Sequence, residues 1–114
     1  MVSIHLPFVP TTRQDQLDAL GDATRRAIVT RLLAGPMPVG RLARGFPMSR
    51  PAISQHLRVL KEARLVTDRA EGTRRFYELD PKGFDALRDY LDRFWTVALD
   101  AFKRRVEDPK RRTP

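Results

Sequence analysis

The segment Ser49–Ala63 separates apolar from polar side chains sharply. Drawn as a helix with about 100° of rotation per residue, it gathers Ile53, Leu57 and Leu60 in one narrow stripe. The opposite side is formed by Pro51, Ser54, Gln55 and Arg58. Hydroxyl, amide and guanidinium groups are the ones that contact phosphates and base edges of DNA. The pattern therefore predicts a helix with one face in a core and the other face arranged to recognise a duplex.

Helical spacing also runs through the chain before this segment. A first helix is expected over 11–20, and Asp22 is placed to cap a second helix. In that second helix one buried face is expected, formed by Ile28, Val29, Leu32 and Leu33. Residues 39–43 suit a short third helix, and Ser49 is placed to cap the fourth. The order is that of a helix-turn-helix preceded by two further helices.

After residue 64 the period changes to that of extended chain. Two short strands are expected over 65–70 and 74–79, joined by a turn in which Gly72 supplies a positive φ. A long last helix should then run from Pro81 to about Val106. The predicted fold is mainly α with a small β-hairpin wing, a winged helix-turn-helix that dimerises through its first and last helices.

The length and charge of the chain narrow its class. With 114 residues, it is expected to form one domain over 11–106, with an extended arm over 1–10 and a disordered basic tail over 107–114. It has 22 Lys and Arg against 14 Asp and Glu, a net charge of +8 that attracts polyanions. No run reaches the roughly 18 apolar residues of a membrane span, and no secretory signal is visible. With no cysteine in the chain, we expect a cytoplasmic protein without membrane partners.

Four segments in this order and spacing resemble the ArsR/SmtB family of bacterial winged-helix repressors. They are Ala19–Ile28, Val39–Ala43, Ser49–Leu60 and Gly72–Tyr77. The likeness covers roughly residues 17–95. It implies a homodimer that binds an inverted-repeat operator in double-stranded DNA and represses transcription, commonly of its own operon.

The chain also departs from this family. The founding metal sensors carry a cysteine pair near the recognition helix, or Asp and His ligands along the last helix. Here there is no cysteine, and the two histidines are His5 and His56. The resemblance therefore implies a branch without a metal site, so neither metal nor cofactor is expected, and the effector stays unknown. Arg64 stands where the family usually has glycine, and a left-handed conformation there would cost about 1 kcal/mol relative to glycine.

The recognition helix and the wing supply the expected DNA contacts. We expect Arg58 to bind guanine and Gln55 to bind adenine, while Ser49 and Ser54 hold phosphates or cap the helix. For the arginines of the hairpin, contact with phosphates or the minor groove is favoured over the alternative that they are only solvated surface charges. The expected DNA-binding residues are Ser49, Arg50, Pro51, Ser54, Gln55, Arg58, Arg69, Arg74 and Arg75.

The last helix carries an apolar arc too wide for one small core to cover. Exposed apolar surface on this scale usually marks an interface, so we predict a two-fold contact between two copies. The expected interface residues are Leu17, Leu20, Leu91, Phe94, Trp95, Ala98 and Phe102. A hydrophobic effector or cofactor pocket around Phe94, Trp95 and Phe102 is the alternative.

Some assignments stay open. His56 is either a packed histidine bonded to backbone or a DNA contact. Arg25 and Arg26 oppose the dipole of the helix that they begin, and a salt bridge, for which Asp22 is available, is favoured over a phosphate. The sequence predicts a sequence-specific transcriptional regulator, with a sequence-independent nucleic-acid-binding or architectural protein as the alternative. The sequence contains no Gly-rich phosphate loop, no metal-ligand cluster and no nucleophile–base pair, so an enzyme is not predicted.

Overall fold

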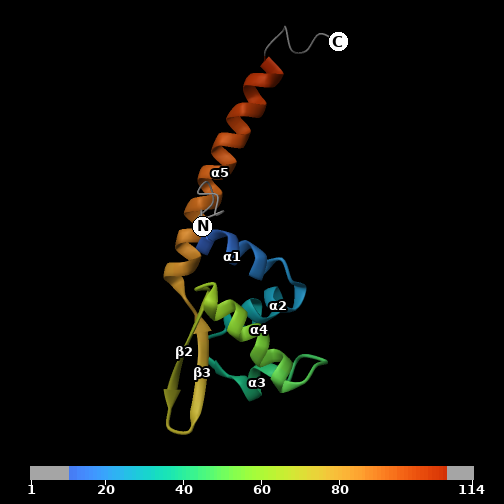
Figure 1. The fold of residues 1–114 in the computed structure, drawn as a ribbon, viewed down its shortest axis with the longest axis vertical. Coiled ribbons are helices and arrows are strands. Elements are labelled where there is room, and N and C mark those ends of the chain that lie inside the picture. The colour runs from blue at the N-terminus through green and yellow to red at the C-terminus, as the bar shows by residue number, and fades with distance from the viewer. Residues whose placement is uncertain (1–10, 108–114) are drawn as a thin grey trace, which may run out of the picture. The chain divides into compact units, whose positions relative to one another are not determined.

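The computed structural model describes residues 11–107 (Figure 1). The elements are α1 (Thr11–Leu20), α2 (Ala23–Leu32), β1 (Met37–Pro38), α3 (Val39–Ala43), α4 (Arg50–Glu62), β2 (Val66–Glu71), β3 (Arg74–Leu79) and α5 (Pro81–Glu107). The predicted N-terminal arm and, apart from Glu107, the predicted tail lie outside the described residues. Two compact units divide the chain, the first ending at Phe84 and the second beginning at Asp85. The predicted helical fold with a wing is confirmed.

Two helices begin where their capping residues predict. The Asp22 carboxylate accepts a hydrogen bond from the backbone N–H of Arg25 at 3.0 Å. At the start of α4, the Ser49 hydroxyl accepts one from the backbone N–H of Ala52 at 3.2 Å. Pro51 stands in the first turn, where its missing N–H has no intrahelical partner to lose.

The core of the first unit lies between α2, α3, α4 and the base of the wing. Ile53, Leu57 and Leu60 are fully buried, so the stripe predicted for α4 is confirmed. The buried face predicted for α2 is partly wrong, because Ile28 and Leu32 are buried but Leu33 is 72% exposed. Leu33 follows the last helical residue and lies roughly 140° around the axis from Ile28, so it points away from the side of α2 that is buried.

The wing contains a third strand that the sequence pattern did not reveal. The sheet order is β1-β3-β2, and both pairings are antiparallel. Met37 pairs with Tyr77, and Pro38 pairs with Phe76. A strand of two residues has no detectable period, so only its partner strand identifies it. Gly72 has φ +63° at the hairpin turn, as predicted.

The turn after α4 places Arg64 in the left-handed conformation and passes close to Gly83. Arg64 has φ +63°, its N–H bonds to the carbonyl of Lys61, and the N–H of Leu65 bonds to the carbonyl of Leu60. This pattern is a Schellman motif with arginine at the left-handed position that usually carries glycine. A Cβ on Gly83 would lie 1.7 Å from the Arg64 carbonyl oxygen. Glycine at residue 83 is therefore required for the start of α5 to approach this turn.

Candidate nucleic-acid interface

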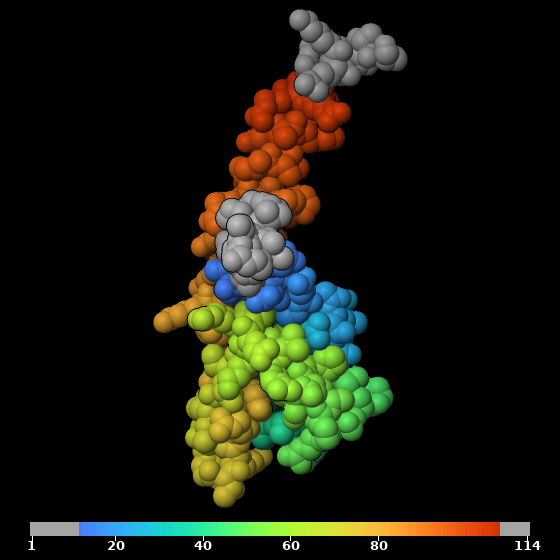
Figure 2. Space-filling model, viewed as in Figure 1, coloured from blue at the N-terminus to red at the C-terminus, as the bar shows by residue number. Residues whose placement is uncertain are grey.

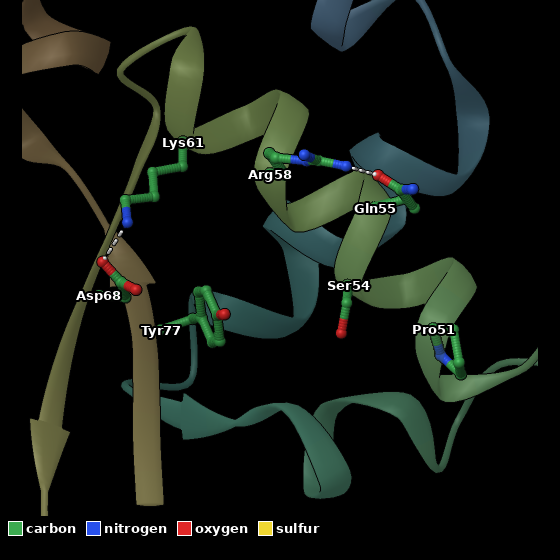
Figure 3. Close-up of a pocket in the computed structure, with 7 residues that line it drawn as sticks. All are labelled: Pro51, Ser54, Gln55, Arg58, Lys61, Asp68 and Tyr77. Atoms are coloured by element: carbon green, nitrogen blue, oxygen red, sulfur yellow. Dashed lines mark hydrogen bonds and ion pairs between the residues drawn. The ribbon is translucent and has the colours of Figure 1, made fainter.

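The outer face of α4 borders a cleft of about 440 Å³ beside the wing. Its lining residues, drawn in Figure 3, are Pro51, Ser54, Gln55, Arg58, Lys61, Asp68 and Tyr77. In Figure 2 the surface is recessed between the yellow wing and the light-green α4. Four predicted DNA-binding residues thus share one concave surface to which the wing also contributes.

The two side chains predicted to read bases are bonded to one another. The Arg58 guanidinium donates a hydrogen bond to the Gln55 side-chain oxygen, with 2.5 Å between Nη2 and Oε1 (Figure 3). Residues three apart lie next to each other on a helix surface. Both side chains are exposed, so their remaining donors face solvent. The pair presents an amide and a guanidinium side by side, the two groups that read adenine and guanine edges in a major groove.

Asp68 joins the recognition helix to the wing. Its carboxylate pairs with Lys61 of α4 at 2.8 Å and with Arg75 of β3 at 2.9 Å, and only 9% of its side chain is exposed. The hydrogen bond from Lys61, supported by the bond from Arg75, lowers the pKa of Asp68 below its ordinary value. The sequence pattern did not identify Lys61 and Asp68 as part of this surface, because it does not show which cation pairs with the Asp68 carboxylate.

The three wing arginines have different surroundings. Arg69 pairs with Glu71 at 2.8 Å and also with Glu78. Arg75 pairs with Asp68 on the face of the wing that borders α4. Arg74 lies over the Phe76 ring at 5.3 Å and forms no ion pair within residues 11–107. Arg74 is therefore the wing arginine whose charge no carboxylate of the described chain offsets.

His56 faces α2 and packs beside its N-terminus. Its side chain is half-buried, and Nδ1 lies 3.4 Å from Arg25 Nη1 and 3.9 Å from the Asp22 carboxylate. Of the two alternatives left open for His56, the structure shows the packed position, but the partners are side chains rather than backbone. Because a guanidinium only donates, Nδ1 accepts from Arg25 in the tautomer that leaves Nδ1 without a proton. The backbone N–H of Arg25 is the main cause of the lowered pKa of Asp22, to which His56 adds a smaller effect.

The salt bridge favoured for the first-turn arginines of α2 is not among the ion pairs of the described chain, so that prediction is wrong. Arg25 Nε donates to the Ala19 carbonyl at 2.7 Å, and Arg26 Nη1 donates to the Leu20 carbonyl at 2.8 Å. The last carbonyls of a helix lack intrahelical partners and carry partial negative charge. These arginines therefore cap the C-terminus of α1, which offsets their unfavourable place at the start of α2.

In the second unit, the described residues 85–107 belong to α5 and carry exposed apolar side chains. Phe94, Trp95 and Phe102 are 54%, 57% and 65% exposed, and Leu99 and Val106 are also exposed. The Phe94 and Trp95 rings meet edge to face, with 5.9 Å between their centroids. The other four predicted interface residues are half-buried: Leu17 and Leu20 in the first unit, and Leu91 and Ala98 in the second. Within residues 11–107, no helix is both long and apolar enough to span a bilayer.

The chain is similar to known regulators of transcription. Residues 22–68 match the family model described as bacterial regulatory protein, arsR family. The chain is 63% identical over 89 residues to the HTH-type transcriptional regulator Rv2034 of Mycobacterium tuberculosis, which covers 78% of this chain and 83% of that protein. It is 40% identical over 62 residues to the transcriptional repressor SdpR of Bacillus subtilis, which covers 54% of this chain and 69% of that protein.

Solved structures agree with this likeness. A possible transcriptional regulator for arsenical resistance superposes with a TM-score of 0.68 at 51% identity, over 77% of this chain and 92% of that one. A homodimeric winged helix-turn-helix DNA-binding domain from Mycobacterium bovis superposes with a TM-score of 0.60 at 26% identity, over 76% and 78% of the two chains. The fold and the exposed face of α4 define a DNA-binding regulator of transcription, which is not a class of enzyme. The chain belongs to the ArsR family.

Proposed function

We propose that the protein is a homodimeric repressor that binds an inverted-repeat operator through α4. The observation that carries this proposal is the exposed Gln55–Arg58 pair on the recognition helix, beside a wing tied to that helix by Asp68. Arg58 binds guanine and Gln55 binds adenine. Ser49, Pro51 and Ser54, at the start and in the middle of α4, approach the phosphate backbone of the DNA. The protein acts in the cytoplasm, on double-stranded DNA.

The backbone contacts come from arginines of α4 and the wing. Arg50, Arg74 and Arg75 supply charge that displaces counterions from the duplex, which provides affinity without sequence preference. Arg69 shares its charge with Glu71 and Glu78, so we expect it to contribute the least of the wing arginines. Its guanidinium must leave one of these carboxylates before it can contact a phosphate.

Dimerisation is supported by the exposed apolar face of α5 and by the homodimeric relative of known structure. We assign the contact to Leu17 and Leu20 of α1 and to five residues of the last helix. These five are Leu91, Phe94, Trp95, Ala98 and Phe102. A two-fold axis through this contact brings two copies of α4 to successive turns of a duplex, about 34 Å apart. SdpR is named a repressor, which favours repression as the direction of control.

The test is competition between selected and random DNA. Duplexes selected by the protein from a random library are labelled, and unlabelled random duplex competes for binding. A sequence-specific regulator should prefer its selected site by a factor of about a thousand or more, and the site should be an inverted repeat. A ratio near one would instead favour the sequence-independent binder. A reporter gene behind the selected site should then be expressed less when the protein is present.

A further inference from the structure

A second cleft, of about 710 Å³, opens between α3, the start of α4 and the tip of the wing. Five arginines line it, and its lining includes no Asp or Glu. They are Arg41, Arg44, Arg50, Arg74 and Arg75. Tyr77 lines both this cleft and the one beside the outer face of α4. The arginine cleft therefore adjoins, at Tyr77, the surface to which base reading is assigned.

The charge of the arginine cleft is almost uncompensated. Of its five arginines, only Arg75 forms an ion pair within the described residues, with Asp68. Like charges around a concave surface reinforce one another and concentrate counter-ions there. Guanidinium groups bind phosphate oxygens in a bidentate geometry. A ligand with several phosphate groups fits this site better than a single carboxylate does.

Gly40 leaves room for one of these arginines. A Cβ at residue 40 would lie 3.3 Å from both the Cζ and an Nη of Arg50. The Arg50 guanidinium therefore lies against the backbone of α3, in space that any other residue would reduce. The α3 segment is itself braced, because Arg31 donates to the Arg41 carbonyl at 3.4 Å and lies over the Phe46 ring at 5.7 Å.

We propose that the arginine cleft binds backbone phosphates of one DNA strand, with Arg41 and Arg44 of α3 as phosphate contacts and Gly40 as a positioning residue for Arg50. This inference rests on the proposed function and extends it to α3, which carries none of the DNA-binding residues expected from the sequence. DNA is favoured over a soluble oligophosphate because the cleft adjoins the polar surface of α4. Phosphate contacts fix the protein on the duplex and carry no base preference.

The first experiment is the double variant Arg41→Ala/Arg44→Ala, tested on the selected operator and on random duplex over a salt series. Each lost phosphate contact lowers the salt slope by about 0.9. The affinity lost between 50 and 200 mM salt should therefore shrink by about tenfold per protomer, on both duplexes alike. The matched control, Arg93→Ala/Lys103→Ala, removes two exposed cations from α5 and should leave the slope unchanged.

The second experiment tests Gly40 through Arg50. Gly40→Ala should weaken DNA binding several-fold without lowering the midpoint of thermal unfolding, because alanine favours a helix more than glycine does. In an Arg50→Ala background, the same substitution should have no further effect on affinity, since the guanidinium that it displaces is absent. Equal losses in both backgrounds would overturn the positioning role of Gly40.

The outcomes separate this inference from the proposed function. An unchanged slope in the double variant, with operator preference intact in the wild type, overturns the phosphate contacts and leaves the repressor standing. Absence of any operator preference in the wild type overturns the proposed function itself. Inorganic tripolyphosphate is the probe for a soluble ligand. If it raises the unfolding midpoint of the wild type but not of the double variant, while the DNA slope is unchanged, the DNA assignment is wrong.

Discussion

The recognition helix α4 and the second half of α5 are both amphipathic, but their apolar sides have opposite surroundings. In α4, Ile53, Leu57 and Leu60 are completely buried by the rest of the first unit. In α5, Trp95 and Phe102 remain more than half exposed. Burial of such side chains is worth about 1.5–3 kcal/mol each, so the apolar side of α4 is stabilised by its own chain whereas that of the second half of α5 is not. The difference supports the proposal that α4 presents its polar face to DNA and that α5 presents its apolar face to a second copy of the chain.

The largest expected effect tests the buried side of α4. Leu57→Ala should lower the free energy of unfolding by about 2–5 kcal/mol, because it leaves a cavity in the core. Denaturant unfolding at one fixed protein concentration measures this change, since stability of a dimer depends on concentration. The control is Leu33→Ala, which removes the same atoms from an exposed position and should change stability by less than about 0.5 kcal/mol.

The exposed side of α5 is tested next, by Trp95→Ala. If this face joins two copies, the substitution should weaken dimerisation by about 2 kcal/mol or more, roughly thirtyfold in the dissociation constant. Sedimentation equilibrium measures the change, and Arg93→Ala on the same helix should leave the dissociation constant unaltered. A wild-type chain that stays monomeric at high concentration would remove the interface altogether.

The polar side of α4 is tested by Arg58→Ala. The loss of a bidentate base contact should cost about 1–3 kcal/mol on the preferred operator and relax preference at one position. Binding to a panel of single-base operator variants measures both effects. Arg74→Ala is the comparison, because a phosphate contact should weaken all duplexes alike and lower the salt slope by about 1. Unchanged preference in Arg58→Ala would mean that this face of α4 does not read bases.

A smaller effect is expected where α4 ends. Arg64→Gly should raise the free energy of unfolding by about 1 kcal/mol, because glycine adopts the left-handed conformation without strain. Thermal unfolding measures the gain. Gly72→Ala provides the opposite comparison at the wing turn, which also has φ +63°, and should lower stability. If Arg64→Gly is no more stable than the wild type, the arginine compensates through contacts of its own.

The smallest effect concerns the link between α4 and the wing. The folded-state pKa of Asp68 lies below the ordinary value of 3.8, so its ion pairs stabilise the fold above that pH and are lost as pH falls through the folded value. Asp68→Asn should therefore be less stable than the wild type at neutral pH, by at most about 1 kcal/mol for pairs with exposed cations. The difference should shrink below about pH 4. Unfolding midpoints across this range provide the measurement, and a difference independent of pH would contradict the role of the carboxylate charge.

Much of the fold could be predicted because its signals are local. The caps at Asp22 and Ser49, the turn at Gly72 and the buried stripe of α4 all follow from residues within one or two turns of each other. The exposed face that carries Ser54, Gln55 and Arg58 follows from the same periodicity. The resemblance to the ArsR family rests on these segments as well.

Other features depend on residues far apart in the chain. The Lys61–Asp68–Arg75 cluster, the capping of α1 by Arg25 and Arg26, and the pairing of β1 with β3 need the folded arrangement to be recognised. So does the cleft in which arginines from α3, α4 and the wing converge.

The amino-acid sequence alone therefore determined the helices, the two long strands and which face of α4 is polar, because periodicity and capping act over a few residues. The short strand β1 was not among them. Only the tertiary structure decided which charges are neutralised and which remain available to a phosphate. A guanidinium has no preferred partner in the sequence. Its role is set by the carbonyl, carboxylate or open cleft that the fold places within a few ångströms of it.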